Sequence, residues 1–145
     1  MWMKRNSRKR RVQGFTLIEL LVVLVILGLL ASLVGPRVMK YLGGAKSDSA
    51  RLQIEDFSAT LDMYRLEVGR YPTTDEGLTA LVEAPHGANG WNGPYIKKKQ
   101  VPKDPWGNEY QYKSPGEHGD YDLYSLGADN ADGGTGENRD VISWE

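Results

Sequence analysis

Residues 10–34 read RRVQGFTLIELLVVLVILGLLASLV, and this stretch decides the architecture of the chain. After the two arginines and a short junction, residues 15–34 form an apolar run that carries a single charge, on Glu19. A helix needs about 20 apolar residues to cross the hydrocarbon core of a bilayer. The sequence therefore predicts a transmembrane helix close to the N-terminus.

Charge is distributed unevenly along the chain. The first 14 residues hold six of the 18 lysines and arginines and none of the 19 aspartates and glutamates, so the rest carries a net charge of −7. Basic residues beside a membrane helix hold that end in the cytoplasm, which predicts that the acidic part faces the other side. An acidic folded part argues against nucleic-acid binding, which needs positive charge on the folded surface. The absence of cysteine excludes disulfides, thiol catalysis and cysteine-ligated zinc.

Glu19 is the unusual residue of the apolar run. A carboxylate at the centre of a transmembrane helix costs about 2.5–3.5 kcal/mol and usually has a functional partner, yet residues 15–36 contain no basic residue. Cleavage after Gly14 would create an α-amino group at Phe15, which pairs poorly with Glu19 of its own helix and well with Glu19 of a neighbouring subunit. The alternative is an ordinary secretory signal peptide, which has a shorter apolar core and a small-x-small cleavage site; residues 31–33 match that site poorly.

The stretch Gly14-Phe15-Thr16-Leu17-Ile18-Glu19 resembles the N-terminal signal of the type IV pilins and pseudopilins. The basic leader and the unbroken apolar helix belong to the same resemblance, and Gly35-Pro36 is similar to the family's helix-weakening site. In that family a prepilin peptidase cuts on the cytoplasmic side and methylates the new N-terminal Phe. The resemblance thus implies a leader over residues 1–14, cleavage between Gly14 and Phe15 with N-methylation of Phe15, a membrane and filament-core helix over residues 15–35, and an assembly role for Glu19.

Residues 36–145 begin with the pattern of an amphipathic helix. Apolar residues recur at spacings of three and four, which is typical of a helix with one face on a core. These residues are Ile54, Phe57, Leu61, Tyr64 and Val68. If the helix continues from the membrane segment, Pro36 and Gly43-Gly44 are the positions at which we expect it to bend or melt locally.

The second half of this part predicts a short helix followed by a small sheet. Glycine and proline in residues 69–72 end the long helix, and Thr74-Asp75 is expected to cap a short helix. That helix carries Leu78, Leu81 and Val82. The glycine-rich residues 86–95 predict a loop. Alternating apolar residues and turn signals predict a hairpin and a last strand, within residues 108–114, 120–127 and 140–145. The predicted fold class is α+β, with a long N-terminal helix packed on a small C-terminal antiparallel sheet.

Four segments of this part resemble one branch of the family, the major pseudopilins of type II secretion systems. They are YPTTDEGLTALV (residues 71–82), DPWGN (104–108), YDLYSLGAD (121–129) and DVISW (140–144). Adhesive type IVa pilins usually close a loop near the C-terminus with a disulfide, so the absence of cysteine speaks against them. The resemblance extends from the leader to the last residues and implies a pilin-like fold.

Residues 127–140, GADNADGGTGENRD, combine acidic side chains with glycines. Hard oxygen ligands on a flexible backbone suit Ca²⁺, although the spacing is not that of an EF-hand. Composition alone favours a solvated acidic turn. The resemblance implies instead one Ca²⁺ in this loop, with Thr135 as an uncertain further candidate. By position, the implied ligands are the Leu126 carbonyl and the side chains of Asp129, Asn138 and Asp140.

The resemblance implies a structural subunit and not an enzyme, and the residues show no catalytic arrangement; His86 and His118 are expected at the surface. The implied protein spans the inner membrane once, with a cytoplasmic N-terminus and a periplasmic domain over residues 36–145. It polymerises into a periplasmic pseudopilus that drives export of folded proteins. Its implied partners are other copies, membrane lipid, minor pseudopilins, the prepilin peptidase and the inner-membrane assembly platform.

Two alternatives remain at this point. A type IV pilin for adhesion, motility or DNA uptake shares the same N-terminus. A single-pass membrane protein whose calcium-binding domain acts alone, as an enzyme or receptor, lacks cleavage before the apolar run.

Overall fold

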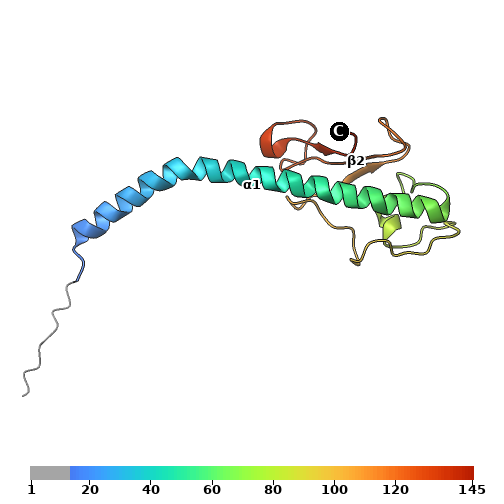
Figure 1. Cartoon of the computed structure of the whole chain (residues 1–145), viewed down its shortest axis with the longest axis horizontal. Coiled ribbons are helices and arrows are strands. Elements are labelled where there is room, and N and C mark those ends of the chain that lie inside the picture. Colours follow the sequence, from blue (N-terminus) through green and yellow to red (C-terminus); the bar gives the residue numbers. More distant parts are fainter. Residues whose placement is uncertain (1–13) are drawn as a thin grey trace, which may run out of the picture. The chain divides into compact units, whose positions relative to one another are not determined.

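The computed structural model describes residues 14–145, which fall into two compact units with a boundary between Val38 and Met39. Helix α1 (Leu17–Val68) contributes to both units. The second unit adds two short 3₁₀ helices and three strands (Figure 1). In chain order these are η1 (Leu78–Leu81), β1 (Gln111–Lys113), β2 (Asp122–Ser125), η2 (Gly136–Asn138) and β3 (Val141–Ile142).

The core of the second unit lies on one face of α1. The predicted apolar stripe is confirmed, because four of its five residues are buried and Val68 is partly buried. Residues from the rest of the unit complete the core, among them Leu78, Leu81, Tyr110, Leu123 and Val141. The rings of Phe57 and Tyr110 meet edge to face with their centroids 5.2 Å apart. A helical stripe with spacings of three and four can bury one side only, so the sheet covers that side of α1.

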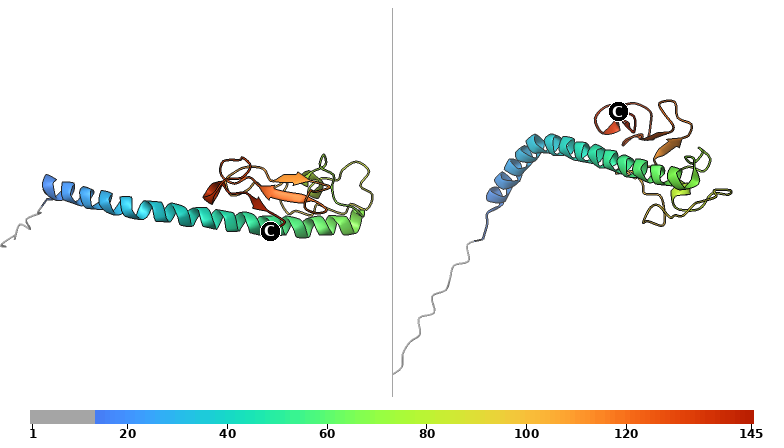
Figure 2. Two further views of the ribbon diagram at one scale, coloured as in Figure 1. Left: turned by 90° about the horizontal axis from the view of Figure 1, so that it is seen from above. Right: turned by 45° about the vertical axis from the view of Figure 1, so that its right-hand side comes forward.

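The sheet is antiparallel, with the strand order β1-β2-β3, and lies along α1 in both views of Figure 2. Tyr112 pairs with Leu123, and Ser125 pairs with Val141. The predicted α+β fold class is therefore confirmed. The strands are shorter than the predicted segments because flanking residues have other partners: the Asn108 main-chain N–H donates to Asp104 Oδ1 at 2.8 Å and starts a turn before β1.

Helix α1 continues without interruption through Pro36 and Gly43-Gly44. Of the two outcomes expected there, a bend or local melting, the continuous helix shows no melting at these positions. Proline removes one N–H group, whereas the neighbouring helical bonds remain. Gly43 is buried against the side chain of Glu137, and this tertiary contact offsets the low helix propensity of glycine.

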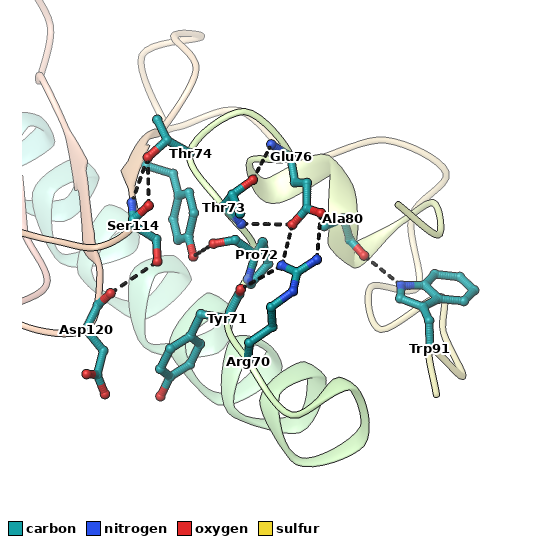
Figure 3. A network of polar contacts seen from close by, with 11 residues as sticks. Arg70, Tyr71, Pro72, Thr73, Thr74, Glu76, Ala80, Trp91, Ser114 and Asp120 are labelled. Atoms are coloured by element: carbon teal, nitrogen blue, oxygen red, sulfur yellow. Dashed lines mark hydrogen bonds and ion pairs between the residues drawn. The ribbon is translucent and has the colours of Figure 1, made fainter. Parts of the chain in front are cut away.

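The segment after α1 is held by a capping box (Figure 3). The Thr73 main-chain N–H donates to Glu76 Oε2 at 2.9 Å, and the Glu76 N–H donates to Thr73 Oγ1 at 3.3 Å. This reciprocal pair is a helix-start signal of the T-x-x-E type. The prediction that Thr74-Asp75 provides the cap is wrong, because Thr74 Oγ1 instead bonds the main chain of Ser114. Arg70 completes the network with two bonds to the Glu76 carboxylate, at 2.7 and 2.8 Å.

The glycine-rich residues 86–95 form an irregular loop, as predicted. The Trp91 indole N–H donates to the Ala80 carbonyl at 2.8 Å, and the Tyr95 main-chain N–H donates to the Leu81 carbonyl at 2.8 Å. The Tyr95 hydroxyl bonds Glu67 near the end of α1. The loop is thereby fixed to both η1 and α1.

We expect the Arg70–Glu76 pair to make stability depend on pH. The Arg70 guanidinium lowers the pKa of Glu76 to about 2, helped by the Thr73 main-chain N–H. A lowered folded-state pKa stabilises the fold above the unfolded value near 4.5, and this stabilisation is lost as the pH falls through 2. The Arg70 side chain is 42% exposed, so its charge is screened by solvent. We therefore expect the pair to contribute about 1 kcal/mol to the free energy of unfolding at pH 7.

The measurement is chemical denaturation of the full chain in detergent micelles between pH 2 and pH 7, with the Glu76→Gln variant beside the wild type. The variant should be less stable at pH 7, and the difference should shrink below pH 4.5. Glu83→Gln is the matched control, because Glu83 is exposed and forms no ion pair within residues 14–145. An equal loss in both variants would contradict the assignment.

Candidate functional site

The first candidate site is the start of helix α1. Residues 15–34 are exposed throughout, and Phe15 is 92% exposed. α1 contains the one window in residues 14–145 that is long and apolar enough to cross a membrane, and none of that window is buried in the chain. An exposed apolar surface of this size needs lipid or other protein copies to cover it.

Glu19 closes a second capping box at this helix start. The Thr16 main-chain N–H donates to Glu19 Oε2 at 2.8 Å, the Thr16 hydroxyl donates to the same oxygen at 3.2 Å, and the Glu19 N–H donates to Thr16 Oγ1 at 3.3 Å. The carboxylate therefore satisfies N–H groups that a helix start leaves open. Its second oxygen, Oε1, has no bond within the described residues. The T-x-x-E pattern of Thr16 and Glu19 would have predicted this cap.

The predicted cleavage site lies just before the helix. Gly14, Phe15 and Thr16 are outside the helical span, which begins at Leu17. A Cβ placed on Gly14 would meet no atom within 4 Å. The bond between Gly14 and Phe15 therefore lies in exposed, non-helical backbone. Cleavage and methylation at these residues stay predictions, and the basic residues 1–13 lie outside the described residues.

The second candidate site is the acidic loop, residues 127–140. Its two ends are joined by the Ala128 N–H, which donates to the Glu137 carbonyl at 2.9 Å. Its middle is joined to its end by the Gly133 N–H, which donates to Asp140 Oδ2 at 2.9 Å. At Gly127 the two ends approach so closely that a Cβ would lie 2.8 Å from the Glu137 carbonyl oxygen. The loop thus folds back on itself, and main-chain oxygens of its last residues lie close to Gly127. We call the place where residues 127–128 meet residues 137–139 the base of the loop.

The predicted calcium ligands lie next to these contacts in the sequence. Leu126 precedes the close approach, Asp129 follows the Ala128 bond, and Asn138 follows Glu137 on the facing segment. Asp129 Oδ1 accepts the Ala131 N–H at 3.2 Å. Asp140 Oδ1 is buried and has no hydrogen-bond partner within residues 14–145. A buried carboxylate oxygen without a partner is costly unless a ligand satisfies it.

The donor chemistry of the base fits a calcium ion. No group of three or more His, Cys, Asp or Glu side chains within the described residues is arranged to hold a metal. The predicted set does not require such a group, since it consists of two carboxylates, one amide and one main-chain carbonyl. Calcium accepts mixed hard-oxygen ligands of this kind, with carbonyls and water completing its shell.

Sequence reasoning missed the residues that anchor the loop. Asp104 is 5% exposed, and its Oδ1 accepts the N–H groups of Trp106 at 3.0 Å and of Asn108 at 2.8 Å. Its Oδ2 accepts the hydroxyl of the fully buried Ser125 at 2.6 Å. Ser125 Oγ in turn accepts the Gly127 N–H at 3.1 Å. The DPWGN segment carries part of the family resemblance, and its Asp followed by Pro and Gly is also a turn signal that would have indicated this role.

His86 and His118 are exposed, as expected, and His118 also makes specific contacts. Its ring stacks on the Trp144 ring, with centroids 4.1 Å apart and planes 4° apart, and Nδ1 lies 3.1 Å from Asp122 Oδ2. Burial alone would raise the pKa of Asp122, but the N–H groups of Glu117 and His118 lower the pKa overall. These contacts tie the hairpin turn to the segment after β3.

Comparison with known proteins follows the same division of the chain. Residues 37–144 match the family model described as "Type II secretion system (T2SS), protein G", and residues 9–35 match the prokaryotic N-terminal methylation motif. The type II secretion system core protein G of Pseudomonas aeruginosa is 49% identical over 142 residues, covering 95% of this chain and 99% of the relative. The core protein G of Escherichia coli K12 is 46% identical, covering 97% of this chain and 94% of the relative.

A solved structure agrees with these relatives. The crystal structure of the major pseudopilin from the type 2 secretion system of enterohaemorrhagic Escherichia coli matches with a TM-score of 0.62 and 35% identity. The match covers 75% of this chain and 95% of that chain. The fold, the N-terminal motif and the relatives along nearly the whole length agree, and the chain belongs to the type II secretion system protein G family.

Proposed function

We propose that this chain is the major structural subunit of a type II secretion pseudopilus, a filament that drives export of folded proteins across the outer membrane. The observation that carries the proposal is an exposed apolar helix start on a folded domain whose relatives are core proteins G over nearly their whole length. The family is structural, and no catalytic role is part of the proposal. The adhesive pilin alternative has less support from these relatives.

The filament is built from copies of this chain. A single subunit that repeats through heterologous, non-closing contacts forms an open helical polymer. The apolar residues 15–34 are exposed in the single chain, and lateral packing of these segments in neighbouring copies would form the filament core. Before assembly, lipid covers the same surface, which makes the protein membrane-anchored.

The finer membrane events are part of the proposal. A prepilin peptidase removes residues 1–14 and methylates Phe15, and the new amine pairs with Glu19 of a neighbouring copy. The open backbone before Leu17, the Glu19 Oε1 atom without a bond in residues 14–145, and the methylation motif over residues 9–35 support this step. The basic leader favours a cytoplasmic N-terminus and a periplasmic body. Minor pseudopilins and an inner-membrane assembly platform would be its further partners.

Calcium at the acidic loop is also a proposal. The Leu126 carbonyl and the side chains of Asp129, Asn138 and Asp140 would hold the ion, and Thr135 is a further candidate. The buried Asp140 Oδ1, which has no hydrogen-bond partner among residues 14–145, supports it. When bound, calcium supplies positive charge that neutralises the loop carboxylates and joins the two ends of the loop. Asn138 adds an oxygen without charge, so the site carries less negative charge than one with a third carboxylate.

Chelation of calcium should lower the melting temperature of the full chain in detergent micelles. A ligand at about 100 times its Kd adds about 2.7 kcal/mol, which shifts the melting temperature of a domain of about 100 residues by roughly 10 °C. Asp140→Ala should lose most of this calcium response. Asp75→Ala is the control and should keep it, because Asp75 is exposed, lies outside the loop and has no side-chain bond within the described residues. An unchanged melting temperature after chelation would remove the metal proposal.

Two experiments test the function: deletion of the gene in its host followed by an inventory of secreted proteins, and mass spectrometry of the mature N-terminus of the chain from the wild-type host. We expect loss of exported folded proteins and a methylated Phe15 at the start of the mature chain. Loss of surface filaments or twitching with export intact would favour the adhesive pilin. An intact Met1, or cleavage after the apolar run, would favour the single-pass membrane protein.

A further inference from the structure

Gly43 and Gly44 are adjacent in helix α1 and have different surroundings. Gly43 is buried, and a Cβ built on it would lie 2.6 Å from Glu137 Oε1 and 2.9 Å from Glu137 Cδ. A Cβ built on Gly44 would meet no atom within 4 Å. Both glycines are unfavourable inside a helix, but only Gly43 has a neighbour that requires the absence of a side chain.

The Glu137 side chain therefore occupies the space that any other residue at position 43 would fill. The carboxylate has no hydrogen bond or ion pair within residues 14–145, and Glu137 is nevertheless half-buried. Its burial comes from contact with the helix and not from a polar partner. Contact with a helix backbone at this distance is possible only where the helix carries glycine.

The main chain of Glu137 belongs to the base of the acidic loop. Its carbonyl accepts the Ala128 N–H at 2.9 Å and lies against Gly127. The next residue, Asn138, is one of the proposed calcium ligands. A single residue thus contacts α1 through its side chain and holds the two ends of the loop together through its main chain.

We propose that Glu137 seated on Gly43 joins the acidic loop to helix α1, so that cation binding in the loop stabilises residues 43–50 of the helix. This inference rests on the calcium site of the proposed function. It adds Glu137 as a positioning residue and Gly43 as the residue that leaves space for the Glu137 side chain. Coupling between two sites is reciprocal in binding free energy. Loss of the join should therefore weaken calcium binding as well as release the helix.

The test uses the full chain in detergent micelles and four variants: Gly43→Ala, Gly44→Ala, Glu137→Ala and the double variant Gly43→Ala/Glu137→Ala. Amide hydrogen exchange, which reports local opening, is measured over residues 43–50 and 127–140 with calcium and with a chelator. Calcium affinity is measured by titration. Gly44→Ala is the matched control, because it makes the same helix-favouring change without meeting Glu137.

Calcium should slow exchange of residues 43–50 in the wild type and in Gly44→Ala, but not in Gly43→Ala or Glu137→Ala. We expect calcium affinity to fall about fivefold or more in the last two variants and to stay unchanged in Gly44→Ala. The melting temperature should rise in Gly44→Ala and fall in Gly43→Ala. The melting temperature of the double variant should be higher than that of Gly43→Ala, because the double variant lacks the Glu137 side chain with which the new methyl group would clash.

Equal protection of residues 43–50 by calcium in the wild type and Glu137→Ala would overturn the inference. Where calcium changes neither loop exchange nor stability in the wild type, the metal proposal fails separately. The metal-free protein then tests the contact between Glu137 and Gly43 by itself. Gly43→Ala must speed amide exchange of residues 127–140, and Gly44→Ala must not. The same exchange in both variants would overturn the join itself.

Discussion

Glu19→Gln should abolish filament assembly and protein export while leaving the folded body intact. Glutamine keeps the reciprocal bonds of the capping box with Thr16, so the helix start is preserved and only the charge is lost. A charged group costs about 2.5–3.5 kcal/mol at the centre of a membrane helix and less near its end, and an ion pair between Glu19 and the Phe15 amine of a neighbour removes this cost. Loss of about 1.4–2.8 kcal/mol at each subunit contact weakens that contact roughly ten- to a hundredfold.

The measurement compares sheared filaments, exported proteins and membrane insertion in the wild type and the variant. Thr16→Val is the matched control, because it removes the hydroxyl bonds at 3.2 and 3.3 Å and keeps the charge of Glu19. We expect Thr16→Val to assemble. If Glu19→Gln assembles and exports normally whereas Thr16→Val does not, Glu19 acts as a helix cap and the pairing account is wrong.

Asp104→Ala should be the most destabilising single change in the body. The substitution leaves the buried Ser125 hydroxyl and the N–H groups of Trp106 and Asn108 without their acceptor. A buried donor left without its acceptor costs about 1–3 kcal/mol, so the loss of an acceptor that serves three donors should cost about 3 kcal/mol or more. The base of the acidic loop should loosen too, because Ser125 Oγ accepts the Gly127 N–H.

Chemical denaturation of the full chain in detergent micelles measures this loss. Asp56→Ala is the matched control, since Asp56 is exposed on α1 and its side chain has no bond within the described residues. We expect the control to lie within about 0.5 kcal/mol of the wild type. A similarly small loss for Asp104→Ala would show that the buried network contributes little.

Local patterns predicted the parts of the fold that depend on local physics. The spacing of Phe57, Leu61 and Tyr64 gives a helix with one buried face, and all three side chains are buried. The turn residues Pro115 and Gly116 between two alternating segments predicted the hairpin of β1 and β2. Long periodic segments and tight turns carry such signals because their hydrogen bonds join residues close in sequence.

Contacts between distant segments carried no such signal. Asp104 bonds Ser125 across 21 positions, and Gly43 is buried by Glu137 from the far end of the chain. Glycine at position 43 therefore indicated a weak point in the helix, whereas the structure shows a contact surface. The capping boxes at Thr16 and Thr73 were different, since their T-x-x-E spacing is local and would have predicted both.

A filament structure that shows side chains at the start of α1 tests the central claim most directly. The account predicts that the Glu19 carboxylate of each subunit lies within about 4 Å of the Phe15 amine of a neighbouring subunit, the distance of an ion pair. It would be contradicted by a filament in which Glu19 bonds only Thr16 of its own chain and the Phe15 amine of every neighbour lies elsewhere.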